Sequence, residues 1–127
     1  MKFCLLIGLL WSAPGWALSP ERAHKKSDPW LMKKIERIDD REDIIIIIEE
    51  MTIRRSPQFL PILLKYANHP LEDVRRSSVE ALIAYGPALD DDRRDQIYLD
   101  RLSDKNQGIS KLARTGILQR MQSEVNV

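Results

Sequence analysis

Apolar and small residues recur at helical spacing in the stretch from residue 68 to residue 86, the most regular part of the chain. Spacing of i, i+4, i+7, i+8 and i+11 aligns one side of an α-helix, on Val74, Ser78, Ala81, Leu82 and Tyr85. Gly86 and Pro87 follow. They predict the end of the helix, because glycine accepts a left-handed cap and proline cannot continue the hydrogen-bond ladder.

The same periodicity predicts five further helices along the chain. The positions that they would bury are, in order, Leu31, Ile35 and Ile38; Ile44, Ile47, Ile48 and Met51; Phe59, Leu60, Leu63, Leu64 and Ala67; Ile97, Tyr98 and Leu102; and Ile109, Leu112, Ala113, Gly116, Ile117 and Met121. The pattern is typical of an all-α domain.

Residues that favour helix starts precede several of these segments. Asp28 is expected to be an N-cap with proline behind it, and Asp40 with Asp43 resembles a capping arrangement. Ser56 opens the next helix by the same reasoning. Pro61 falls inside that helix, so we expect it to remove a hydrogen bond and bend the helix.

Five consecutive isoleucines, residues 44–48, admit two interpretations. Their β-branched side chains favour a strand, but a lone strand would have no partner in an otherwise helical chain, so we predict a helix. A continuous apolar run covers more than one helix face. Ile45 and Ile46 are therefore expected either to be sandwiched between neighbours or to form a partly exposed adhesive patch.

The amino terminus has the layout of a secretory signal peptide. Lys2 precedes a short apolar run, and small residues at Gly15 and Ala17 predict cleavage after Ala17. The run is much shorter than the roughly 20 residues of a membrane-spanning helix, so we expect no membrane span after cleavage. The predicted organisation is a signal peptide (1–17), a flexible lead (18–27), a helical repeat domain (28–122) and a frayed tail (123–127).

Charge and cysteine content narrow the classes of partner. The chain has 20 Lys and Arg against 19 Asp and Glu, and cleavage would remove Lys2 and leave the two signs in balance. Such a balance gives no global attraction to nucleic acid or to an anionic membrane. Cys4 is the one cysteine and lies in the predicted signal, so the mature protein would be stabilised by packing without disulfides.

A second copy of the central pattern lies 35 residues further along the chain. This offset places Val74 on Ile109 and Ser78 on Ala113, and it continues with Ala81 on Gly116, Leu82 on Ile117 and Asn68 on Ser103. A helical hairpin that recurs at this period is typical of an α-solenoid.

The segment from Asn68 to Arg75, Asn-His-Pro-Leu-Glu-Asp-Val-Arg, with Ser78, Ala81 and Leu82 behind it, resembles a HEAT repeat. The match is specific over 56–86 and weaker over 90–121, where Ser110 replaces the arginine; 28–55 matches only as a helix pair. The resemblance implies a short right-handed α-solenoid of about three antiparallel helix pairs. It also implies that Arg75 bonds to acidic residues of the adjacent repeat. A six-helix orthogonal bundle is the alternative fold.

Motifs of familiar enzymes are absent from the sequence. His24 and His69 have no partners at metal-ligand spacing, and the acidic run from Asp90 lacks the glycine and glutamate positions of a calcium loop. The chain has no phosphate loop, nucleophile elbow or Cys-x-x-Cys pair. We therefore predict a protein without catalytic residues, cofactor or metal.

The implied repeat geometry places the second helix of each pair on one face, where a protein partner would bind. The predicted partner-binding residues are Arg76, Val79, Glu80 and Ile83, which the 35-residue offset maps onto Lys111, Arg114, Thr115 and Leu118. A mixed apolar and charged strip is what a protein-binding groove requires, although the same strip would also suit a merely solvated face.

Two rival functions use other residues. Self-association, giving a homo-oligomer, would use the isoleucine helix at Ile45 and Ile46. A nucleic-acid or anionic-ligand module would use the arginine pairs at 54–55, 75–76 and 93–94. The balanced charge and the predicted export to the periplasm or the exterior of the cell argue against nucleic acid.

Overall fold

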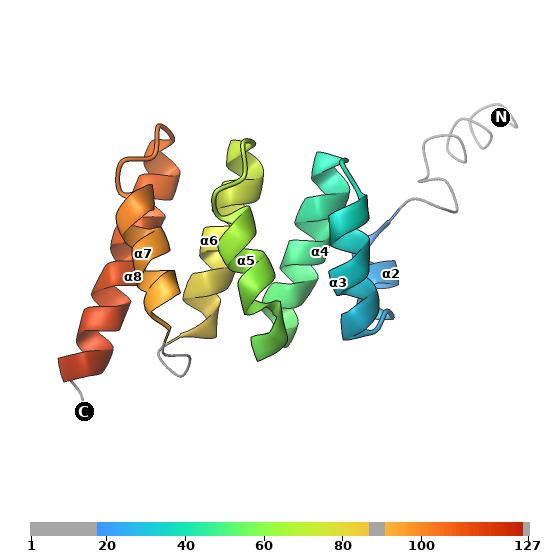
Figure 1. The fold of residues 1–127 in the computed structure, drawn as a ribbon, viewed down its shortest axis with the longest axis horizontal. Coiled ribbons are helices and arrows are strands. Elements are labelled where there is room, and N and C mark those ends of the chain that lie inside the picture. The colour runs from blue at the N-terminus through green and yellow to red at the C-terminus, as the bar shows by residue number, and fades with distance from the viewer. Residues whose placement is uncertain (1–17, 87–90, 126–127) are drawn as a thin grey trace, which may run out of the picture.

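The structure, a computed structural model, describes residues 18–86 and 91–125. These residues are all-α, as the pattern predicted, with no strand among them (Figure 1). The elements are α2 (Pro20–His24), α3 (Asp28–Arg37), α4 (Arg41–Arg54), the 3₁₀ helix η1 (Pro57–Phe59), α5 (Leu60–Tyr66), α6 (Glu72–Tyr85), α7 (Asp92–Arg101) and α8 (Gln107–Val125). The predicted signal peptide and its cleavage after Ala17 lie outside these ranges.

The helices form three consecutive pairs, α3 with α4, α5 with α6 and α7 with α8, which follow one another in a row (Figure 1). Helix α6 packs against both α4 and α8, and α5 also contacts α7. Helix α2 lies against α4 at the amino-terminal end of the row. The core therefore runs along the row between the members of each pair and between successive pairs.

Helix α6 has the buried face that its sequence predicts. Its small and apolar positions are all buried, namely Val74, Ser78, Ala81, Leu82 and Tyr85. Gly86 ends the helix at φ 69°, a left-handed value that suits glycine; Pro87 lies outside the described residues. Helix α8 begins 35 residues after α6, and its Ile109, Ala113 and Gly116 are buried in turn.

The isoleucine run is helical, and the predicted face is confirmed. Ile44, Ile47 and Ile48 are buried, whereas Ile45 and Ile46 are partly buried and pack against the core. Asp40 caps this helix by accepting a 3.1 Å hydrogen bond from the backbone N–H of Asp43, also as predicted. Helix α4 packs against α2, α3 and α6. These neighbours explain why its apolar residues cover more than one helix face.

Two expectations about helix starts are wrong. The N-cap of α3 is Ser27, which accepts from the backbone N–H of Trp30, whereas Asp28 stands in the first turn and binds Arg54. Pro61 does not bend a helix, because the chain turns first through η1 and α5 begins at Leu60. Pro61 therefore lies in the first turn of α5, where a missing N–H costs nothing.

The expectation of a flexible lead over 18–27 needs correction. Residues 20–24 form α2, capped by Ser19, and Ala23 is fully buried. Arg54 of α4 holds this segment by donating to the backbone carbonyls of Ala23, His24 and Lys26 at 3.2, 3.2 and 2.6 Å. Helix α8 likewise continues to Val125, into the segment 123–127 that was expected to fray.

Candidate functional site

The two second helices place most of the predicted partner-binding residues in solvent. Arg76 and Glu80 of α6 are exposed, as are Lys111, Arg114 and Leu118 of α8. Leu118 is 58% exposed. These five side chains form the accessible part of the predicted strip.

Val79 is a correction, because it is 0% exposed and no partner could contact it. Val79 stands four residues after Arg75 and three after Arg76. These two arginines of α6 bond to Asp104 and Asn106 in the turn between α7 and α8. Val79 therefore lies on the flank of α6 that faces α8. Ile83 is partly buried and packs against the core, so it offers only part of its side chain.

An apolar surface that sequence reasoning missed lies at the carboxyl-terminal end of the row. Leu99 of α7 is 54% exposed and Met121 of α8 is 57% exposed. Both line a groove of about 180 Å³, together with Asp95, Ile117, Arg120 and Glu124. Met121 was expected in the core; it is exposed because no described helix covers this side of α8. We call Leu99, Ile117, Leu118 and Met121 the end patch.

The two helices that carry the end patch, α7 and α8, pack closely against each other. A Cβ atom on Gly116 would lie 2.6 Å from Cζ of Tyr98, so only glycine permits this approach of α8 to the buried ring. Burial raises the pKa of Tyr98 to about 12. Arg120 of α8 also donates to Asp95 of α7 at 2.8 Å. The two helices that line the groove are therefore tightly packed, and the pair of Asp95 and Arg120 lies on its wall.

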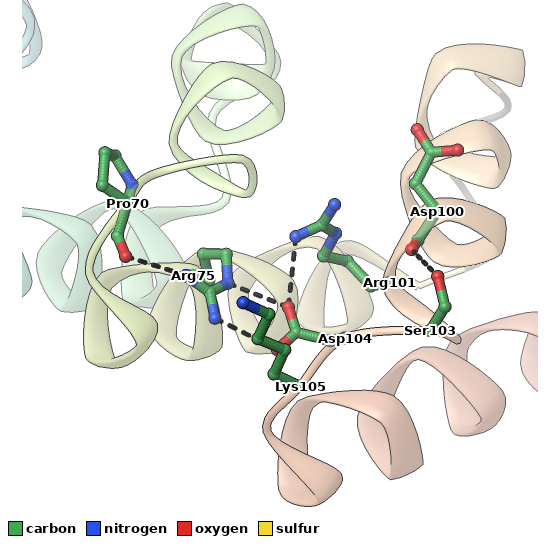
Figure 2. A pocket seen from close by; sticks show the side chains of 7 residues that line it. All are labelled: Pro70, Arg75, Asp100, Arg101, Ser103, Asp104 and Lys105. Carbon is green, nitrogen blue, oxygen red and sulfur yellow. Dashed lines mark hydrogen bonds and ion pairs between the residues drawn. The ribbon is translucent and has the colours of Figure 1, made fainter.

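Arg75 joins the second helix pair to the third, as the resemblance implied. Its Nε and Nη2 atoms donate to the two carboxylate oxygens of Asp104 at 2.8 and 3.1 Å, and Arg101 donates to the same carboxylate at 3.1 Å (Figure 2). Burial opposes the charge of Asp104, yet the bonds from Arg75 and from the backbone N–H of Asn106 hold its pKa below the usual value.

A polar cavity of about 360 Å³ opens beside this junction, with Pro70, Asp100, Ser103 and Lys105 also on its walls (Figure 2). The Asp104 side chain is only 1% exposed, and both of its oxygens accept hydrogen bonds from the chain itself. The carboxylate is thus occupied in holding two helix pairs together. We assign the cluster to the fold and not to a ligand.

The arginine pairs do not gather into one anion-binding site. Arg54 binds Glu50 and Asp28, Arg93 binds Asp91, and Arg94 is buried and donates to the Gly86 carbonyl. Arg75 binds Asp104. In each of the three arginine pairs, at least one guanidinium group is therefore bonded within the chain. The structure thus offers no support for the nucleic-acid alternative.

The histidines also have structural surroundings. His24 contacts the buried Glu50 at 3.2 Å, and His69 stacks on Tyr66 and accepts from the backbone N–H of Leu71. Burial, with a smaller contribution from Arg75, lowers the pKa of His69. Among the described residues, no group of three or more histidine, cysteine or acidic side chains is placed to bind a metal ion.

No protein-family model, curated protein or solved structure matched this chain. Helices long and apolar enough to cross a membrane are likewise missing from the described parts of the chain.

Proposed function

We propose that this protein is an exported, non-enzymatic protein-binding module built as a short right-handed α-solenoid of the HEAT-like kind. The consecutive pairing of α3–α4, α5–α6 and α7–α8 supports this fold (Figure 1). The 35-residue separation of α6 and α8 supports it too, as does the ion pair between Arg75 and Asp104 across two pairs. The signal-like residues 1–17 support export.

The end patch on α7 and α8 is the observation that carries the binding function. Three of its side chains are more than half exposed, and large apolar side chains clustered in this way mark interaction sites more often than solvated faces. Lys111 and Arg114 of the predicted strip are exposed seven and four residues before Leu118 on α8, so they share its side of the helix. A polar rim around an apolar centre is the usual composition of a protein interface.

Charge and shape suggest the kind of partner segment that fits. Lys111 and Arg114 lie one turn or two before Leu118 on the same exposed face, so a partner with acidic residues beside its apolar anchors would be complementary. The 180 Å³ groove beside Met121 is large enough for one apolar side chain. We therefore expect a helical or extended acidic-apolar segment to bind here.

The experiment is affinity capture from cross-linked cell envelope and culture fluid, with Leu118→Glu as the test variant. A polar group in place of an exposed leucine should leave the thermal melt unchanged and abolish capture of the partner. Ile53→Glu is the matched control, because Ile53 is 67% exposed but lies on α4 at the other end of the row. Capture that survives Leu118→Glu, or is lost equally in the control, would contradict the proposal.

Self-association is separated from this function by light scattering of the same variants. Ile45 and Ile46 are partly buried against the core, which leaves little of either side chain for a second copy. A concentration-dependent dimer that persists in Leu118→Glu would assign self-association to another surface. We therefore retain self-association only as an outcome of this measurement.

A further inference from the structure

The outer face of α3 carries an unbroken stripe of one tryptophan and three cations. Trp30, Lys33, Lys34 and Arg37 stand at i, i+3, i+4 and i+7, so they share one side of the helix. Leu31 and Ile35 are fully buried on the opposite side. The stripe is thus fixed in orientation by the packing of α3. We call these four residues, with Lys26 beside them, the basic stripe.

Trp30 organises the lysines around it. The ammonium groups of Lys26 and Lys34 lie over its ring, 4.9 and 5.9 Å from the centroid. Shallow cavities of about 70 and 240 Å³ flank the ring, and the residues that line them include Arg22, Lys33 and Arg37. Two cations are therefore held at defined positions before any partner arrives.

Three cations of α3 differ in their ion pairing from the arginines at the helix junctions. Lys33, Lys34 and Arg37 form no ion pair within the described part of the molecule. Asp43 is the one carboxylate that lines either cavity. Asp43 also interacts electrostatically with Lys34, so it offsets part of the charge of one cation and leaves Lys33 and Arg37 without a lining carboxylate. The stripe is a positive patch on a chain whose total charge is close to zero.

We propose that the basic stripe binds the surface of a membrane containing anionic phospholipid. The cations project from one convex helix face. Lipid phosphate groups are mobile within their layer, so they can rearrange to meet all of these cations at once. Each lysine or arginine near such a surface adds about five-fold to binding. Tryptophan favours the interfacial layer, where its ring has one apolar and one wet side.

Nucleic acid and acidic protein fit the stripe less well. Lysine ammonium groups already lie over the Trp30 ring, so they reduce the ring surface on which a base could stack. Trp30 packs partly against the core, so the stripe has no large, freely exposed apolar side chain of the kind that usually gives a protein interface its affinity. It lies at the opposite end of the row from the end patch, so both surfaces could be occupied together (Figure 1).

The test is co-sedimentation of the purified protein with vesicles, every variant having the same amino terminus. Vesicles of phosphatidylcholine with phosphatidylglycerol should bind the wild type, and phosphatidylcholine alone should not. Lys33→Gln/Lys34→Gln should weaken binding roughly thirty-fold, and Lys33→Glu/Lys34→Glu should weaken it further. Added salt should release the protein, because exposed charges are screened.

The matched control for the glutamate pair is Lys65→Glu/Lys105→Glu, which changes the net charge equally at two exposed lysines outside the stripe, the end patch and the predicted strip. It should keep wild-type vesicle binding. Equal loss in this control would show that only net charge matters, and binding to the neutral vesicles would point to another surface; either result would overturn the proposal. Unchanged binding in Lys33→Gln/Lys34→Gln would also overturn it. Retention by an oligonucleotide or an acidic peptide, without vesicle binding, would assign the stripe to that class of partner instead.

Discussion

Replacing Arg75 with methionine tests whether the third helix pair is held to the second by the buried ion pair. The change removes two hydrogen bonds to the Asp104 carboxylate, at 2.8 and 3.1 Å, from a site where Asp104 is 1% exposed and Arg75 14% exposed. Removing one partner of a buried pair costs about 3–5 kcal/mol. Arg101 and the backbone N–H of Asn106 still reach the carboxylate, so we expect the lower end, about 3 kcal/mol.

Urea unfolding followed by circular dichroism measures this loss of unfolding free energy. In a thermal melt the same loss should lower the melting temperature by roughly 10 °C for a chain of this size. Arg41→Met is the matched control. The Arg41–Asp73 pair also connects neighbouring pairs of helices, at 3.1 Å, but both of its side chains are more than half exposed. An exposed pair of this kind contributes about 0–1 kcal/mol. Equal losses in the two variants would refute the assignment of Arg75 as the junction.

The pH dependence of the same two proteins gives a second readout. The pKa of Asp104 in the folded protein lies below its ordinary value of 3.8, so the stability from its charge is present above that value and is lost as the pH falls through the folded-state pKa. The difference in unfolding free energy between wild type and Arg75→Met should therefore shrink on acidification below about pH 4. A difference that stays constant down to full acid unfolding would contradict an electrostatic origin.

Three other outcomes are expected. Gly116→Ala places a Cβ 2.6 Å from the Tyr98 ring and should cost about 1–3 kcal/mol in thermal denaturation; an unchanged melt would mean that α8 can shift away. Arg54→Ala removes the bonds to three carbonyls of the α2 segment. Hydrogen exchange over 20–24 should therefore accelerate, while α6 stays protected. Unchanged exchange would show that packing of Ala23 holds α2. Amino-terminal sequencing of the secreted form should read Leu18 first, whereas a retained Ala17 would disprove the cleavage position.

Local periodicity was enough to predict most helices and the residues that they bury. The isoleucine run shows why, since Ile44, Ile47 and Ile48 face inward at the spacing that helical geometry requires. Helix α2 escaped prediction because one short turn buries only Ala23. It is stabilised by Arg54, about thirty residues away in the sequence. Such a contact leaves no periodic trace.

The candidate surfaces were predicted less well, for two physical reasons. Mapping α6 onto α8 identifies equivalent faces, but the surroundings of the two helices differ. Helix α6 packs against two other second helices, α4 and α8, whereas α8 packs against only one, α6. Val79 is therefore buried and Met121 is exposed. A sum of charges hides where the charges lie. Trp30, Lys33 and Lys34 show the helical spacing in the sequence itself, yet the balanced total conceals the patch that they form.

The two ends of the helix row are not equivalent, and this sets the stoichiometry of any assembly at the end patch. At the amino-terminal end, α2 packs against α4 and its Ala23 is buried. At the other end, Leu99 and Met121 are exposed. The amino-terminal end has a different groove, lined by residues of α2 and α4 that include the exposed Ile53, so the two ends offer different surfaces. Binding of a partner that fits the end patch should therefore saturate at one partner per molecule.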